Sequence, residues 1–166
     1  MLSSLKEVLD RVKTLTHGQR TAITNTHESH DALLDAQRHL HEALNAGQPG
    51  RTREWVQQVA TKLKAAQHAI ERHTRLVRNQ DGLYVALQHE APQLAEQIED
   101  LIEDMEFIAV KAADLAAMLE EIGTGDHKSL SKIRPDTALM IAHLHALMAK
   151  ENDLIFRHVR EQADST

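Results

Sequence analysis

Apolar residues recur every three or four positions along almost the whole chain, and this spacing constrains the fold more than any other feature. The clearest run comprises Leu94, Ile98, Leu101, Met105, Ile108, Ala112, Leu115, Leu119 and Ile122. Such a run covers one face of an α-helix, whereas a half-buried strand alternates every second residue. Six Gly and three Pro in 166 residues are too few for the many turns of a β-sandwich or barrel. We therefore predict an all-α protein.

Turn residues divide the helical pattern into four long segments. The long helices are predicted at roughly 20–46, 52–78, 94–122 and 135–161, with a short helical turn at 83–90. Four amphipathic helices with short connections are typical of an up-down-up-down four-helix bundle. A further amphipathic stretch predicts an N-terminal helical extension over residues 1–16. The chain is thus expected to form one domain, 1–166, with its bundle over 20–161.

Composition excludes several classes of function. The net charge of −6 and the presence of only four aromatic residues argue against a nucleic-acid partner. The absence of Cys rules out disulfides and thiol chemistry. The chain has no apolar run long enough to span a membrane and no pattern of a signal peptide, so we expect a cytoplasmic location. The N-terminal helix either packs across the bundle end or joins two protomers of a homo-oligomer.

Polar residues interrupt the apolar faces at four places: His30, His73, Glu151 and His158. An unpaired polar group in a core costs roughly 1–3 kcal/mol, so each of these needs a partner. Imidazoles and carboxylates that converge from several helices are how bundles hold non-heme iron or manganese. The alternative is a hydrogen-bonded histidine in the core, or one that reaches water near a helix end.

The sequence carries no recognisable catalytic motif. No Ser or Thr lies in a nucleophile elbow, and no glycine-rich phosphate loop is present. A Glu followed three residues later by His occurs nowhere, which argues against a ferritin-like di-iron carboxylate bundle. We therefore predict no catalytic residues and no enzymatic activity.

Three stretches carry a resemblance to a known family. They are His73 near the end of the second long helix, the run from Asp81-Gly82-Leu83-Tyr84 to Glu90-Ala91-Pro92, and Asp153-Leu154-Ile155-Phe156. With the order and lengths of the helices, these stretches resemble the hemerythrin-like (HHE cation-binding) four-helix bundles over most of residues 20–160. The resemblance implies a non-heme metal centre inside the bundle.

The chain departs from the family's ligand pattern at several positions. His30 and His73 occupy two histidine positions, but Val77 stands where a bridging carboxylate is expected. Asp104 and Ile108 replace the two histidines of the third helix. On the fourth helix Leu147 replaces a histidine, and Asn152 or Asp153 falls at the carboxylate position; a shift by one turn brings in His143 and Glu151.

The resemblance therefore implies a degenerate centre. Its expected ligands are His30, His73 and Asp104, with Glu151 as a further candidate. A weak or mononuclear site of this kind would bind non-heme iron, manganese or zinc, or no metal, and the protein would act as a small sensor or binding protein. The alternatives are a metal-free structural or protein-interaction module and, third, a di-iron oxygen-binding protein or oxidase.

Overall fold

The structure is a computed structural model that describes residues 6–7, 9–10, 12–47 and 49–165. Four long helices and one short helix account for most of these residues: α2 (His17–Asn45), α3 (Thr52–Arg78), α4 (Leu83–Glu90), α5 (Ala95–Gly123) and α6 (Ile133–Asp164). Two single 3₁₀ turns, Pro92–Leu94 and Leu130–Lys132, precede α5 and α6. No strand occurs in the described ranges, so the all-α prediction with four long helices is confirmed.

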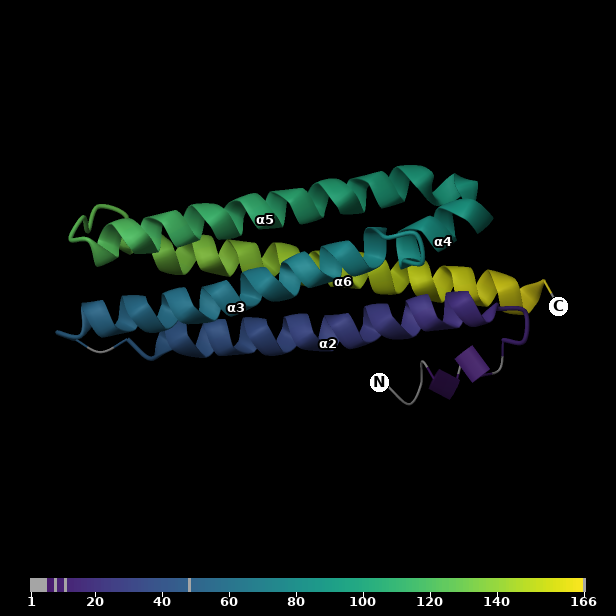
Figure 1. Cartoon of the computed structure of the whole chain (residues 1–166), viewed down its shortest axis with the longest axis horizontal. Helices are drawn as coiled ribbons and strands as arrows, with labels where there is room; N and C mark the ends of the chain where they lie inside the picture. The colour runs from purple at the N-terminus through teal and green to yellow at the C-terminus, as the bar shows by residue number, and fades with distance from the viewer. Residues whose placement is uncertain (1–5, 8, 11, 48, 166) are drawn as a thin grey trace.

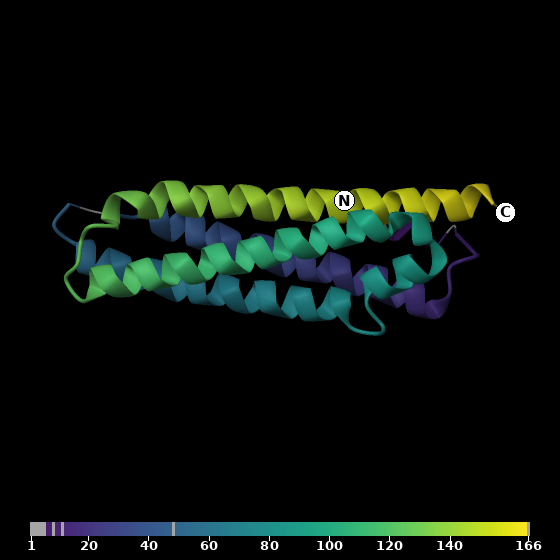
Figure 2. The ribbon, with the colours of Figure 1, turned by 90° about the horizontal axis from the view of Figure 1, so that it is seen from above.

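The long helices lie side by side along one axis, and α4 covers one end of the molecule (Figure 1). The main packing contacts join α2 to α3, α3 to α5, and α5 to α6. Seen from above, α6 extends along the whole length of the bundle (Figure 2). No helix of the described chain is both long and apolar enough to cross a membrane.

The helix α2 begins at His17, earlier than the predicted break around Gly18 allows. Thr16 is its N-cap: Thr16 Oγ1 accepts from the Gln19 amide at 3.2 Å, and Gln19 Oε1 accepts from the Thr16 amide at 2.6 Å. This reciprocal capping box satisfies two otherwise unpaired amides and overrides the weak helix propensity of the Thr-rich stretch. The break therefore lies just before Thr16.

The helix α6 begins at Ile133 and includes Pro135 in its first turn. Proline is tolerated there because the first amides of a helix have no intrahelical acceptor. The start predicted at 135 is thus two residues late, and the helix also continues beyond the predicted end, to Asp164.

The N-terminal segment is helical only in part. Positions 6–7 and 9–10 are helical, positions 13–15 form a turn, and the remainder of the predicted 1–16 extension at 1–5, 8 and 11 lies outside the described residues. Leu9, Val12 and Leu15 join the hydrophobic core of the bundle. The Arg20 guanidinium donates to the carbonyls of all three. The described apolar side chains of this segment therefore pack on the chain's own bundle.

The core is almost wholly aliphatic. Its fully buried members include Val77, Ile98, Ile108 and Leu147. Against this background seven of the described polar residues are buried: Gln19, Thr26, His30, His73, Thr137, Glu151 and His158. Three of the seven meet at one point in the bundle.

Candidate metal centre

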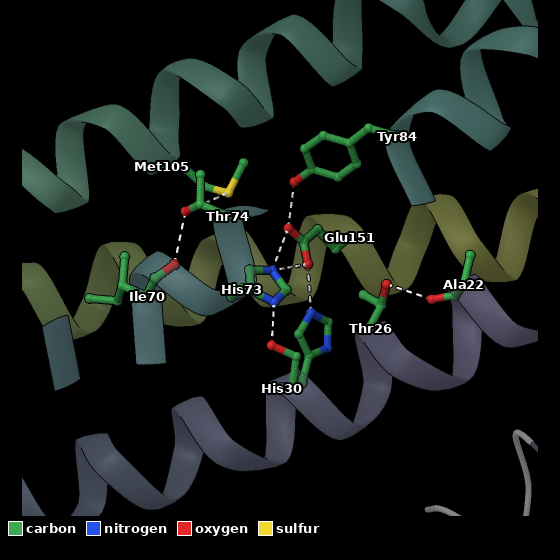
Figure 3. A network of polar contacts seen from close by, with 10 residues as sticks. Ala22, Thr26, His30, Ile70, His73, Thr74, Tyr84, Met105 and Glu151 are labelled. Atoms are coloured by element: carbon green, nitrogen blue, oxygen red, sulfur yellow. Dashed lines mark hydrogen bonds and ion pairs between the residues drawn. The ribbon is translucent and has the colours of Figure 1, made fainter. Parts of the chain in front are cut away.

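Four helices each contribute one buried polar side chain to a cluster in the bundle interior. They are His30 from α2, His73 from α3, Tyr84 from α4 and Glu151 from α6 (Figure 3). We call these four residues the buried cluster. The imidazole and carboxylate ligand atoms of His30, His73 and Glu151 all lie within 4.8 Å of one another, the only such group among the described residues.

The helical register explains why the two histidines and the glutamate point inward. His30 lies in line with the buried Thr26 and Leu33 on α2, and Glu151 follows the buried Leu147 by four residues on α6. Positions three or four apart share one face of a helix. The apolar neighbours therefore fix the direction of each polar side chain.

The inward position of Tyr84 depends instead on a close approach between two backbone segments. Gly82 caps α4, and a Cβ there would lie 2.5 Å from the Leu76 carbonyl oxygen and 2.6 Å from that of Val77. Only glycine lets the chain pass so near the end of α3. This tight turn allows α4 to start against α3 and directs Tyr84 into the bundle (Figure 3).

Every oxygen of the Glu151 carboxylate is hydrogen-bonded. His30 Nε2 lies 2.6 Å from Oε2, and His73 Nε2 lies 2.9 Å from Oε2 and 3.0 Å from Oε1. The Tyr84 hydroxyl donates to Oε1 at 2.5 Å. A carboxylate with no solvent exposure thus receives three donors, which is what a buried charge requires.

The surroundings set the protonation of the glutamate and the tyrosine. Burial raises the pKa of Glu151, but the hydrogen bonds and charges of His30 and His73 lower it more, to about 2. Burial raises the pKa of Tyr84 far above its usual value, and the charge and hydrogen bond of Glu151 add to this effect. At neutral pH Glu151 is an acceptor only, so both Nε2 atoms carry hydrogen and Tyr84 stays a phenol.

The outer nitrogens of the two imidazoles differ. His73 Nδ1 lies 2.8 Å from the hydroxyl of Ser29, a half-buried residue on α2. His30 Nδ1 is buried and has no hydrogen-bond partner among the described residues. The cluster therefore has one imidazole fixed from both sides and one fixed from a single side.

The structure separates Asp104 from the other predicted ligands. Asp104 Oδ2 accepts from Lys150 Nζ at 2.6 Å at the surface between α5 and α6, and Asp104 is not part of the buried cluster. Its position on α5 lies just beside the buried Met105 and Leu101, on the edge of the apolar face. A side chain at that edge reaches a solvent-exposed lysine more easily than the core.

The fourth polar interruption, His158, has a separate partner. Its Nε2 lies 3.2 Å from Glu90 Oε2 at the end of α4. Glu90 keeps 30% of its side chain exposed. This contact is a second histidine–carboxylate pair outside the buried cluster.

Two residues of the site escaped the sequence reasoning. Tyr84 belongs to the stretch that carries the family resemblance, but neither its residue type nor its spacing predicts a ligand or a hydrogen-bonding role. Ser29 interrupts no apolar pattern because it lies at the flank of α2, next to His30. The only signal for Tyr84 is a large, mainly apolar residue two positions after Gly82, in the predicted helical turn at 83–90.

The donor set does not fit a di-iron centre. Such a centre needs bridging carboxylates and several imidazoles, whereas Val77, Ile108 and Leu147 fill the corresponding interior with apolar atoms. The same set does fit a single ion, since two imidazoles and one carboxylate form a common three-ligand arrangement. Ligands about 2.1 Å from one ion lie roughly 3.0–3.4 Å apart, so the nitrogen and oxygen atoms of the cluster, 2.6–3.0 Å apart across their hydrogen bonds, would need to separate only slightly to hold one.

Fold and cluster together define a helical bundle with a buried histidine–carboxylate site. No family model, no curated protein and no solved structure matches the chain. The function is therefore inferred from the residues of this chain.

Proposed function

We propose that the protein is a mononuclear metal-binding helical bundle that acts as a small sensor or binding protein. His30 Nε2, His73 Nε2 and one Glu151 oxygen would be the ligands. The observation that carries the proposal is their convergence, fully buried, from three different helices. Burial of two imidazoles and a carboxylate in an aliphatic core costs desolvation free energy, which favours a shared functional role for the three.

Ser29 supports the same assignment. A histidine that binds an ion through Nε2 carries its hydrogen on Nδ1, and an outer oxygen acceptor usually fixes that tautomer. The Ser29 hydroxyl lies at hydrogen-bond distance from His73 Nδ1 and can accept from it. Tyr84 would in turn hold the carboxylate through Oε1 and leave Oε2 to face the imidazoles.

A bound iron, manganese or zinc ion would supply Lewis acidity, and iron or manganese also a redox couple. The chain's residues exclude water from the cluster and hold three donor atoms in place. Asp104 is left out of the proposed ligand set because its carboxylate pairs with Lys150.

The proposal includes the wider assignment made from sequence. We infer a hemerythrin-like bundle with up-down-up-down helix order and a degenerate centre, supported by the inward positions of His30 and His73. A cytoplasmic location, a homo-oligomer through the N-terminal segment and the lack of a nucleic-acid partner stay predictions from composition and charge.

Elemental analysis of untagged protein tests the proposal. After expression with added iron, manganese or zinc, we expect about one ion per chain. His73→Leu and Glu151→Gln should remove it, while His158→Leu, which removes a buried histidine outside the cluster, should retain it. Absence of stoichiometric metal under all three conditions, or equal binding by the cluster variants, would overturn the proposal.

A metal-free interaction module is the second candidate, and one observation favours it. Apart from His30 Nδ1, the polar atoms of the cluster already have partners within the chain. In that case added metal leaves the melting temperature unchanged. If the cluster binds a metal only in the folded chain, the melting temperature instead rises with the concentration of added metal.

A further inference from the structure

Ser29, His73 and Glu151 form a chain of hydrogen bonds that leads from the half-buried flank of α2 into the core. Ser29 Oγ lies 2.8 Å from His73 Nδ1, and His73 Nε2 lies 2.9 and 3.0 Å from the two Glu151 oxygens. A hydroxyl next to a base that a third group orients is the arrangement of an activated nucleophile. The three residues are separated by 44 and 78 positions in sequence, so the fold alone assembles them.

We propose that Ser29 is a reactive nucleophile, with His73 as its base and Glu151 as the residue that orients the base. The chemical class that it would accept is a small carboxylic ester or another activated acyl compound. This role goes beyond the proposed metal-binding function. It requires the hydrogen of His73 on Nε2, whereas metal binding through Nε2 requires it on Nδ1.

The hydrogen bonds of Glu151 prepare His73 for this role. Because the ionised carboxylate accepts from Nε2–H, a neutral His73 has its lone pair on Nδ1, directed at the Ser29 hydroxyl. Tyr84 and His30 hold the carboxylate from its other sides. The base is therefore fixed in position and tautomer without any contribution from solvent.

A cleft that begins one helical turn from Ser29 offers room for a small substrate. A cleft of about 590 Å³ lies between the first turns of α2, the end of α3 and α4, and its walls include Asn25 and Leu76. Asn25 precedes Ser29 by one helical turn, and Leu76 follows His73 by three residues, so the wall of the cleft lies one turn from the pair. The Asn25 carboxamide is a donor that suits the negative charge of an acyl-transfer transition state.

The reaction balances within these groups. Ser29 Oγ forms a bond to the acyl carbon while its proton passes to His73 Nδ1. The ester's C–O bond then breaks, and the leaving alcohol takes that proton. Water releases the acyl group from Ser29 by the same two steps, so no oxidant, reductant or further reactant is needed.

Metal binding and this chemistry exclude each other at His73. An ion on Nε2 needs the hydrogen on Nδ1, which removes the lone pair that Ser29 requires. Loading with metal should therefore switch the nucleophile off.

Covalent labelling with a fluorophosphonate, mapped by mass spectrometry, tests the inference on the full chain. We expect the metal-free protein to be labelled at Ser29 alone, and Ser29→Ala to abolish the label. His73→Gln should lower the labelling rate by at least about a hundredfold, the usual contribution of a general base. Thr61→Ala is the matched control: its hydroxyl lies on α3 outside the cleft and bonds to the Gln57 carbonyl, so labelling should persist. Circular dichroism confirms that each variant folds.

Two outcomes overturn the inference: no label on the metal-free wild type, or equal label on Ser29→Ala. Addition of Zn²⁺ separates it from the proposed function. Labelling that Zn²⁺ suppresses supports both proposals. Stoichiometric Zn²⁺ binding that leaves the labelling rate unchanged overturns the metal assignment at His73 and sustains the nucleophile, whereas Zn²⁺ binding without labelling in the metal-free protein does the reverse.

Discussion

In the described part of the bundle, histidines contact two carboxylates that differ mainly in enclosure. Glu151 on α6 is fully buried and receives three donors from three other helices. Two turns further along α6, the buried His158 meets Glu90, which keeps 30% of its side chain in solvent. The same residue types thus meet with the carboxylate inside the core at Glu151 and with the carboxylate at the surface at Glu90.

This difference determines what each contact can do. Water stabilises the exposed Glu90 carboxylate whether or not His158 is present, so the pair contributes little. Glu151 has only protein donors, so its charge and those donors depend on each other. The buried contact therefore resists rearrangement, and its donor atoms are not occupied by water.

The largest expected effect is the difference in stability between Glu151→Gln and Glu90→Gln, the same substitution made at each carboxylate. Glu151→Gln leaves buried donors with a poorer acceptor and should lower the free energy of unfolding by roughly 3–5 kcal/mol at pH 7. Glu90→Gln should cost less than about 1 kcal/mol. Urea unfolding of the metal-free proteins measures both values. Similar losses for the two variants would show that enclosure does not distinguish the contacts.

Acid should weaken the buried contact selectively. The pKa of Glu151 is about 2 in the folded chain and 4.5 for the free side chain. The stability that it contributes is therefore complete above about pH 5 and is lost as the pH falls towards 2, by about 3 kcal/mol in total. The stability difference between wild type and Glu151→Gln should shrink over this range in urea titrations. His30→Gln removes an imidazole that lowers this pKa, so the total loss should be smaller and should be complete at a higher pH.

Gly82→Ala tests whether the tight turn before α4 completes the enclosure. The added Cβ would meet backbone carbonyl oxygens, which cannot move aside as a side chain can. We expect a loss of about 1–3 kcal/mol and a weaker near-ultraviolet signal from Tyr84. Gly123→Ala is the control, because nothing lies within 4 Å of a Cβ at that helical position. It should be neutral or slightly stabilising, and an equal loss in both variants would refute the role of the turn.

The fold followed from the sequence because helical spacing is a local property. The positions of His30, His73 and Glu151 on apolar faces predicted burial, since their neighbours three and four residues away are aliphatic. Spacing alone could not tell that these three lie at the same level of the bundle while His158 does not. That level depends on the lengths of the connections and on how the helices pack against each other.

The roles of Tyr84 and Ser29 could not be predicted from the sequence, and the reason differs between the two residues. Tyr84 reaches Glu151 only because Gly82 lets α4 begin against the end of α3, a contact between backbones that no periodicity encodes. Ser29 lies on the flank of α2, where a small polar residue is ordinary on any solvated helix. Its partner became evident only when α3 placed His73 beside it.

The smallest expected effect belongs to Asp104, the ligand candidate that the structure leaves out of the cluster. Asp104→Asn removes one exposed ion pair with Lys150, which should change the free energy of unfolding by less than about 0.5 kcal/mol. Its charge reaches the cluster only at a distance, as a minor contribution to the raised pKa of Tyr84. Metal affinity measured by calorimetry should therefore stay within about threefold of wild type, because screening weakens charges that solvent can reach. A loss of metal affinity as large as that of His73→Leu would mean that Asp104 leaves Lys150 to bind the ion. An exposed carboxylate would then take part in the site together with the buried Glu151.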